Sequence, residues 1–170
     1  MLDAGVAFAE AVGRAMAAAV RHRRPEIVLG TATLGIPVAI ETSRALGIDR
    51  YVVAQKSAKV YLRDPLAVPL RSSTTQGAQR LYVDRRNVPL IAGRRVLVVD
   101  DVAATGESLK AAIALARAAG GEVVAAGVVL TEGNGWRVGL DHDAALLVRL
   151  GHIPQYVHDG GALEVVAGSF

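Results

Sequence analysis

The chain has 170 residues, of which 52% are hydrophobic and 21% charged, so it can build a buried core and is not a disordered protein. It has no cysteine, which excludes disulfides and thiolate-bound metals and is typical of a reducing cytoplasm. The net charge of +3 is too small to predict nucleic-acid binding by itself. We expect a single domain over residues 1–170, a cytoplasmic location and no nucleic-acid partner.

The apolar runs of the sequence are too short to cross a membrane. The longest, from Ile27 to Ile40, is interrupted by glycine, threonine and proline, whereas a membrane helix needs about 20 apolar residues. The start, Met1-Leu2-Asp3, lacks the basic segment of a secretory signal. The mean hydropathy of +0.34 is high for a soluble monomer, so we expect a second copy to cover apolar surface in a homodimer.

Helical and strand patterns alternate along the first third of the chain. They predict a helix over 3–20, a strand over 26–30, a helix over 36–46 that ends at Gly47, and a strand over 51–55. The strands are apolar on both faces, which is typical of a parallel sheet covered by helices on both sides. This part of the sequence therefore predicts βαβ units.

The pattern changes between residues 56 and 92, where no helical period is found. Short strand-like runs at 60–62, 67–70 and 79–84 surround the polar tract 71–77. We interpret this stretch as an antiparallel β flap inserted into an otherwise βαβ chain.

The second half returns to alternation. It predicts a central strand over 96–99, a helix over 105–119, a buried strand over 123–130, and short strands near 144–148, 155–157 and 163–166. The predicted fold class is α/β, with a doubly wound parallel sheet, an antiparallel β flap and short C-terminal strands.

The segment Val96–Ser108, VLVVDDVAATGES, carries the clearest chemistry. An apolar strand ends in two adjacent carboxylates, Asp100 and Asp101, and a helix begins within the small residues that follow. Free N–H groups and the dipole at a helix start bind phosphate, and Thr105 and Ser108 add hydroxyl donors. Neighbouring carboxylates would repel a bare anion, but they suit sugar hydroxyls or Mg²⁺ shared with phosphates. Together these groups predict a site for a phosphorylated ribose.

This segment resembles the phosphoribosyl-diphosphate motif of type I phosphoribosyltransferases, particularly the adenine and xanthine members. The shared pattern is four apolar residues, two acids, two small or apolar residues, and Ala-Thr-Gly-x-Ser/Thr. Ala103 is smaller than the usual branched residue, and Glu107 replaces a common glycine. The resemblance extends from about Pro25 to the C-terminus. Two other interpretations of the acidic pair are a response-regulator receiver domain and a structural helix cap.

The resemblance implies transfer of ribose 5-phosphate from phosphoribosyl diphosphate to a nucleobase, with Mg²⁺ as cofactor and a purine as the favoured acceptor. It implies that Asp100, Asp101 and Lys56 are catalytic, and that Asp100 and Asp101 hold the metal directly or through water. The residues implied to bind the 5-phosphate are Ala104, Thr105, Gly106, Glu107 and Ser108. Those implied to bind the pyrophosphate are Thr31, Ala32, Thr33, Leu34, Lys56 and Lys59. The implied flexible loop contains Arg71, Ser72, Ser73 and Thr74.

Two details of the resemblance concern the loop 31–35. In the family this loop often contains a non-proline cis peptide, and the adenine enzymes usually carry an arginine where this chain has Leu34. The family places the base pocket after strand 123–130, where Trp136 would stack on a purine and Glu132 and Asn134 would read its edge.

A regulator that senses phosphoribosyl diphosphate and binds RNA is the alternative function. No segment precedes the first predicted helix, which disfavours a DNA-binding version. The RNA version would use the arginines Arg21, Arg23, Arg24, Arg85, Arg86, Arg94 and Arg95. The four histidines show no metal-ligand spacing, and we expect them to be structural or solvated.

Overall fold

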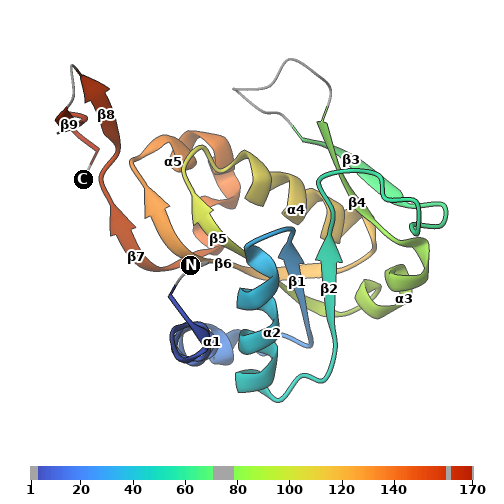
Figure 1. Cartoon of the computed structure of the whole chain (residues 1–170). Helices are drawn as coiled ribbons and strands as arrows, with labels where there is room; N and C mark the ends of the chain where they lie inside the picture. Colours follow the sequence, from blue (N-terminus) through green and yellow to red (C-terminus); the bar gives the residue numbers. More distant parts are fainter. Residues whose placement is uncertain (1–3, 71–78, 160–161, 170) are drawn as a thin grey trace.

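The computed structural model describes residues 4–70, 79–159 and 162–169. Its centre is a parallel sheet of five strands in the order β2-β1-β5-β6-β7 (Figure 1). The strands are β1 (Ile27–Thr31), β2 (Tyr51–Ala54), β5 (Arg95–Ala103), β6 (Glu122–Glu132) and β7 (Leu147–Ile153). From the adjacent β1 and β5, the chain goes outwards to β2 on one side and to β6 and β7 on the other. This arrangement confirms the doubly wound parallel sheet.

Helices cover both faces of the sheet. They are α1 (Val6–Val20), α2 (Gly35–Leu46), α3 (Val88–Ile91), α4 (Glu107–Ala118) and α5 (Gly135–Leu140), with 3₁₀ turns η1 (Arg21–Arg23), η2 (Arg85–Asn87) and η3 (Asp141–Leu146). Helices α1 and α2 pack on one face through a core that includes Met16 and Val38. Helices α3, α4 and α5 pack on the other, where the core includes Leu109 and Trp136. The sheet is therefore buried on both sides, as its apolar strands require.

The end of α2 is fixed by its sequence. Gly47 adopts a left-handed conformation with φ of 76°, and its amide donates to the last carbonyls of the helix. Glycine adopts this conformation without the penalty that a Cβ would bring. The predicted termination of the helix at Gly47 is confirmed.

The predicted flap contains a two-stranded antiparallel hairpin, β3 (Leu66–Leu70) and β4 (Gln79–Val83). Two backbone hydrogen bonds between Gln55 and Tyr82, of 2.8 and 2.9 Å, join it to the chain just after β2. The strand predicted over 60–62 is wrong. The Leu62 amide closes a turn on the Lys59 carbonyl, and the Val60 side chain is fully exposed, so this segment has no neighbouring strand to pair with.

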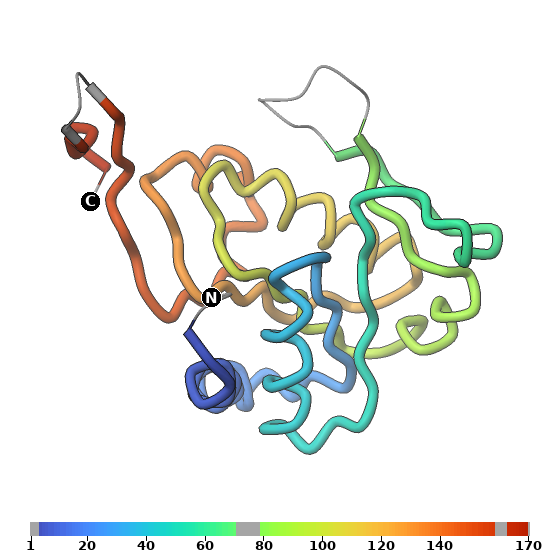
Figure 2. Tube along the Cα trace, in the orientation of Figure 1, coloured from blue at the N-terminus to red at the C-terminus, as the bar shows by residue number. Residues whose placement is uncertain are grey.

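The first C-terminal strand begins at Leu147, three residues later than the pattern predicted, and the other two begin within one residue of their predicted starts. Residues 141–146 form the turn η3, because Asp143 is held inward by two hydrogen bonds from Arg117 of α4. Strand β7 follows at the sheet edge, and β8 (Tyr156–Asp159) pairs with β9 (Ala162–Val165) in a hairpin that stands off the body (Figure 2). Among the residues that the structure describes, no helix is long and apolar enough to cross a membrane.

Candidate active site

The candidate site lies where β1 and β5 end, at the point where the sheet changes direction. The residues from Ile27 to Gly30 pair in register with those from Val96 to Val99, so the loops after the two strands emerge side by side. In open α/β sheets, ligands bind outside the carboxyl ends of the strands at this switch point. The topology thus brings the two predicted phosphate-binding loops together.

Asp100 and Asp101 differ in their surroundings although they are adjacent. Asp100 is only 4% exposed, whereas Asp101 is half-buried. Burial raises the pKa of Asp100 to about 7, and the neighbouring Asp101 adds to the rise. The Thr31 hydroxyl and the positive charge of Lys56 act in the opposite direction on this pKa. The site therefore holds one acid that ionises reluctantly beside another that is open to solvent.

Gly35 leaves room for a close approach between β1 and the acidic pair. A Cβ at Gly35 would lie 2.9 Å from Oγ1 of Thr31 and 3.1 Å from Oδ1 of Asp100. The Thr31 hydroxyl is buried, and the Asp100 carboxyl, whose pKa it lowers, lies next to it. A buried hydroxyl and a buried carboxyl thus face the same small space, and a larger residue at position 35 would fill it.

The loop after β1 has the backbone that the resemblance implied. The peptide bond between Ala32 and Thr33 is cis. Ala32 is buried, Thr33 is exposed and Leu34 is half-buried, so the loop presents mainly backbone and the Thr33 side chain to solvent. An anion bound here would rely on main-chain donors.

The oxygen atoms around Asp100 suit magnesium. Mg²⁺ prefers oxygen ligands and is usually bound by one or two carboxylates together with waters and substrate phosphates. Asp100, Asp101 and the buried Thr31 hydroxyl supply oxygens of that kind. No group of three or more His, Cys, Asp or Glu residues is found in the described ranges, so the protein's side chains fit a shared metal and not an enclosed one.

A pocket of about 160 Å³ lies beside the acidic pair, at the start of α4. It is lined by Val102, Ala103, Ala104, Thr105, Gly106, Ser108 and Leu109. Its volume is several times the ~30 Å³ share of one water molecule, which leaves room for a phosphate group. Four of the five predicted 5-phosphate residues therefore surround one pocket.

The helix that follows begins two residues later than predicted. Gly106 is left-handed with φ of 79°, so regular α4 geometry starts only at Glu107. The Thr105 hydroxyl accepts a hydrogen bond from the Glu107 amide at 3.5 Å. The segment 104–106 is thus a loop that lines the pocket before the helix begins.

Glu107 is the exception among the predicted 5-phosphate residues. Its side chain lines a different cavity, between α4 and β3, together with Pro69, Lys110, Ala111 and Ala114. The carboxylate therefore does not line the phosphate pocket, which explains how an acid is tolerated at this position. Its backbone amide, at the first position of α4, donates to the Thr105 hydroxyl.

Lys56 follows directly after the bridge between Gln55 and Tyr82, which ties the end of β2 to the hairpin. Its side chain is exposed, and its charge acts on Asp100. Lys59 is also exposed but sits in the turn that Leu62 closes, and no contact joins it to the acidic pair in the described structure. Of the two lysines, Lys56 is the one whose charge acts on the pKa of Asp100.

The predicted base-pocket residues are not arranged as expected. Trp136 is 5% exposed and belongs to the core around α4, so the expectation that its ring stacks on a purine is corrected. The Asn134 side chain donates to the Gly168 carbonyl at 2.8 Å and accepts from Arg137 at 3.4 Å, which uses it structurally. Glu132 is half-buried at the end of β6.

The predicted flexible-loop residues Arg71, Ser72, Ser73 and Thr74 lie outside the described residues.

Sequence reasoning missed a polar cluster next to Trp136. Arg149 of β7 donates to the Thr131 hydroxyl at 3.0 Å, and the His152 ring lies 2.8 Å from the same oxygen. The guanidinium of Arg149 lies 5.7 Å from the Trp136 ring centre, and that of Arg137 lies 4.5 Å from it. The sequence of β7 gave no signal for this cluster, because strand alternation places Arg149 and His152 on opposite faces.

Comparison with known proteins agrees with this geometry. Residues 1–151 match the model of the phosphoribosyl transferase domain. The orotate phosphoribosyltransferase of Caldanaerobacter subterraneus is 31% identical over 75% of this chain and 56% of its own length. The xanthine phosphoribosyltransferase of an Exiguobacterium species is 32% identical over 71% of this chain and 62% of its own length.

Solved structures of phosphoribosyltransferases have a similar fold. The crystal structure of adenine phosphoribosyltransferase from Thermoanaerobacter pseudethanolicus superposes with a TM-score of 0.70 at 21% identity, covering 85% of this chain and 80% of that one. The chain spans about half the length of the orotate enzymes that it matches. Since the family model covers residues 1–151, this chain belongs to the phosphoribosyl transferase domain family.

Proposed function

We propose that this chain transfers ribose 5-phosphate from phosphoribosyl diphosphate to a ring nitrogen of a nucleobase and releases pyrophosphate. The observation that carries the proposal is the position of Asp100 and Asp101 directly beside the pocket at the start of α4. A phosphate held in that pocket places the attached ribose next to the two carboxyls. The family relationship supports the same reaction.

The chemistry needs charge stabilisation and positioning more than it needs a nucleophilic side chain. The C1–O bond of the ribose breaks while a C1–N bond forms, so the ring carbon becomes oxocarbenium-like and the pyrophosphate gains negative charge. Lys56 stabilises the departing pyrophosphate, and the carboxylates hold the ribose hydroxyls. Backbone groups of residues 104–108 fix the 5-phosphate. The rate enhancement then comes largely from a correctly oriented substrate.

Mg²⁺, when bound with the substrate, neutralises charge on the pyrophosphate. Asp100 and Asp101 would hold it, directly or through water, with the Thr31 hydroxyl close by. The loop from Thr31 to Leu34 would bind the pyrophosphate through its backbone.

The acceptor that we propose is a purine. The resemblance of the motif to the adenine and xanthine enzymes supports this choice, as does the similarity to a xanthine relative. The orotate relatives make orotate the competing acceptor. Leu34, where adenine enzymes usually carry an arginine, favours a purine other than adenine within that proposal.

The test is pyrophosphate release from phosphoribosyl diphosphate and Mg²⁺ with adenine, guanine, hypoxanthine, xanthine, uracil and orotate offered separately. We expect release with at least one purine and none without a base. Release with orotate alone would overturn the purine acceptor and leave the transfer reaction standing. No release with any of the six bases would overturn the transferase.

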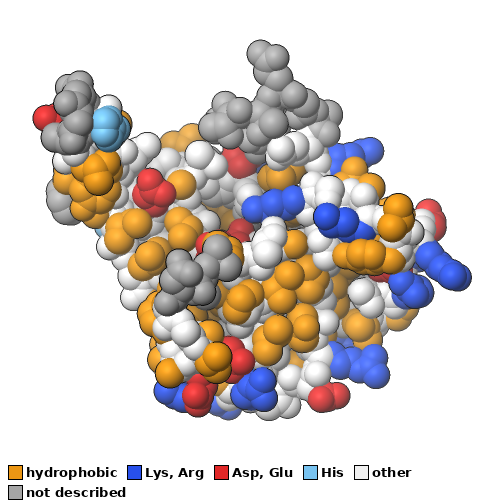
Figure 3. All heavy atoms as spheres, in the orientation of Figure 1, with side chains coloured by type: hydrophobic (Ala, Val, Ile, Leu, Met, Phe, Trp, Pro, Cys, Tyr) orange, Lys and Arg blue, Asp and Glu red, His pale blue; other side chains and the backbone are white. Residues whose placement is uncertain are grey.

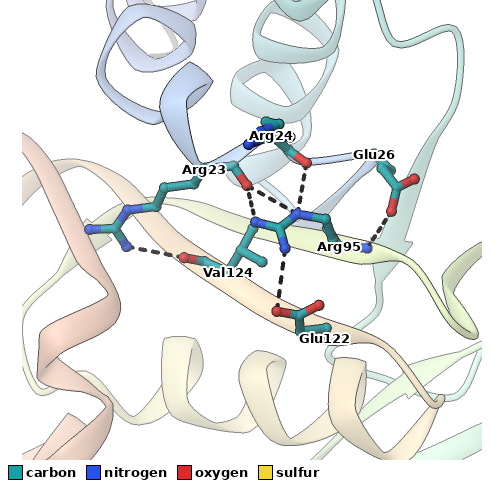
Figure 4. Close-up of polar contacts among 6 residues, drawn as sticks. All are labelled: Arg23, Arg24, Glu26, Arg95, Glu122 and Val124. Atoms are coloured by element: carbon teal, nitrogen blue, oxygen red, sulfur yellow. Dashed lines mark hydrogen bonds and ion pairs between the residues drawn. The ribbon is translucent and has the colours of Figure 1, made fainter.

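A regulator that binds RNA is the second candidate, because the chain is rich in arginine. The arginines shown in Figure 4 already have partners within the protein, which favours the enzyme. The Arg95 guanidinium donates to the carbonyls of Arg23 and Arg24 and pairs with Glu122. The Arg23 guanidinium donates to the Val124 carbonyl at 3.1 Å. Of the seven arginines that the RNA version would use, five have side-chain partners in the described structure: Arg21, Arg23, Arg85, Arg86 and Arg95.

Guanidiniums committed to carbonyls and carboxylates contribute less to phosphate binding than free ones do. A gel shift with RNA at increasing salt separates the candidates. Tight binding that falls steeply with salt supports the regulator, and weak binding together with base-dependent pyrophosphate release supports the enzyme.

We also propose that two copies associate. Apolar side chains gather over α2 and β2 on the face shown in Figure 3, where Tyr51 is 39% exposed and Ile36 and Ile40 are half-buried. Light scattering should give about twice the monomer mass of 17.7 kDa. A mass equal to that of one chain would contradict the dimer.

A further inference from the structure

Helix α5 packs backbone to backbone against the loop that forms the phosphate pocket. A Cβ added at Gly139 would overlap the carbonyl oxygen of Thr105 and would lie 3.4 Å from Cα of Gly106. Gly139 is buried, and its φ is not in the left-handed region, so an alanine there would suffer no backbone strain of its own. Its lack of a side chain therefore serves the contact with the loop.

Glycines on both the loop and the helix make this close contact possible. A Cβ at Gly106 would lie 3.0 Å from the carbonyl oxygen of Trp136, and one at Gly135 would lie 3.1 Å from that of Ala104. Gly135 and Gly139 are four residues apart and so share one face of the helix. The face of α5 that touches the pocket loop is thus free of side chains at both positions.

Helix α5 is anchored and cannot simply retreat from the loop. Trp136 is buried in the core, between the guanidiniums of Arg137 and Arg149. Arg149 is in turn bonded to Thr131 of β6, the strand that pairs with β5. Because the helix is held on this side, added bulk at Gly139 would move the loop 104–106, whose residues Ala104 and Thr105 are exposed, more easily than it would move α5.

We infer that Gly139 is a positioning residue for the 5-phosphate: it lets α5 set the peptide groups of Thr105 and Gly106 against the pocket. This inference rests on the proposed function, since it assigns the pocket to the 5-phosphate. It adds that a residue outside the motif, more than thirty positions later in the chain, determines the shape of the motif's loop. Pyrophosphate binding, at the other loop, does not depend on Gly139.

The test compares two ligands by calorimetry, ribose 5-phosphate and pyrophosphate with Mg²⁺, in the wild type and in Gly139→Ala. We expect the affinity for ribose 5-phosphate to fall by about 10- to 100-fold, the equivalent of one misplaced hydrogen bond to a charged group. Pyrophosphate affinity should stay within about twofold of the wild type, and the KM for phosphoribosyl diphosphate should rise more than kcat falls. A merely structural role would weaken both ligands together.

Gly13→Ala is the matched control. A Cβ at Gly13 would overlap the backbone of Glu41, so this variant disturbs the packing of α1 on α2 as severely but far from the pocket. It should lower the melting temperature and leave the ribose 5-phosphate affinity unchanged. If Gly139→Ala does not fold, Gly135→Ala carries the test, because its Cβ needs the loop to move by only a few tenths of an ångström.

The outcomes separate the inference from the proposed function. Wild-type affinity for ribose 5-phosphate in Gly139→Ala, or in Gly135→Ala where that variant carries the test, overturns the inference, and so does an equal loss for both ligands. A wild type that binds ribose 5-phosphate but never releases pyrophosphate overturns the transferase and leaves the positioning role intact. A wild type that binds no ribose 5-phosphate overturns both.

Discussion

The backbone amide of Asp101 donates a hydrogen bond of 2.9 Å to Oδ1 of Asp100. This contact turns the Asp100 carboxyl back towards the strand end and leaves the half-buried Asp101 as the carboxylate that can reach a ligand. The adjacent acids therefore have different tasks. In the proposed reaction Asp100 would hold the metal and the ribose from the buried side of the site, and Asp101 would contact them from the side open to solvent.

Replacing Asp101 by asparagine tests the second task. Asp101→Asn should lower kcat by about 100-fold or more, since it removes the negative charge placed to stabilise the transition state. Its melting temperature should stay close to that of the wild type, because the amide that bonds to Asp100 is in the backbone. Asp49→Asn, an exposed acid at the opposite end of the strands, is the control. An Asp101→Asn enzyme with wild-type turnover would refute the assigned role.

The raised pKa of Asp100 predicts how stability depends on pH. Burial raises the folded-state pKa to about 7, above the value of about 3.9 in an unfolded chain. Between these two values the folded protein holds a proton that the unfolded chain has lost. The contribution of Asp100 to the free energy of unfolding therefore falls as pH rises from about 4 to about 7 and stays low above that.

Urea unfolding of the ligand-free protein at pH 5 and pH 8 measures the effect. We expect Asp100→Asn to gain stability relative to the wild type at pH 8 and to gain little at pH 5, because the neutral amide keeps the acceptor for the Asp101 amide without the buried charge. Asp49→Asn should show no such dependence. A constant difference between wild type and Asp100→Asn at both pH values would contradict the prediction.

The parts of the site that depend on local sequence were predictable. An apolar run followed by two acids and a small-residue loop before a helix predicts where the phosphate pocket lies, although β5 continues through both acids to Ala103 and does not end at them. The glycine at position 47 ends α2 for a purely local reason. Such features follow from residues within a few positions of each other, so one sequence suffices to find them.

The features that sequence reasoning got wrong depend on distant residues. Trp136 looked available for stacking, but Arg149, thirteen positions later, and the core around α4 cover its ring. Glu107 was an implied 5-phosphate residue, but it lines the cavity next to Pro69 of the hairpin and not the phosphate pocket. Neither the burial of a ring nor the direction of a carboxylate is fixed by neighbours in sequence, because the partners come from other strands.

The two lysines after β2 allow a matched comparison. Lys56→Gln should lower kcat by about 100-fold and weaken pyrophosphate binding, because this cation acts next to Asp100 and faces the developing charge of the leaving group. Lys59→Gln should change kcat by less than about threefold, since an exposed charge in the adjoining turn is screened by solvent. Steady-state kinetics with phosphoribosyl diphosphate measures both, and equal losses in the two variants would mean that the pyrophosphate contact is not specific to Lys56.

Arg117 and Asp143 give a prediction about stability alone. Arg117 of α4 donates two hydrogen bonds, of 3.1 and 2.7 Å, to the buried carboxylate of Asp143 in η3. Arg117→Ala leaves that carboxylate without its charged partner and should cost about 1–3 kcal/mol of unfolding free energy.

Arg44→Ala is the control: it removes the pair between the exposed Arg44 side chain and Glu41 and should cost at most about 0.5 kcal/mol. Urea unfolding of the two variants ranks them, and an Arg44→Ala cost as large as that of Arg117→Ala would show that burial of the acceptor does not decide the strength of these pairs. Activity should survive in both folded variants, because neither arginine lines the pocket at the start of α4.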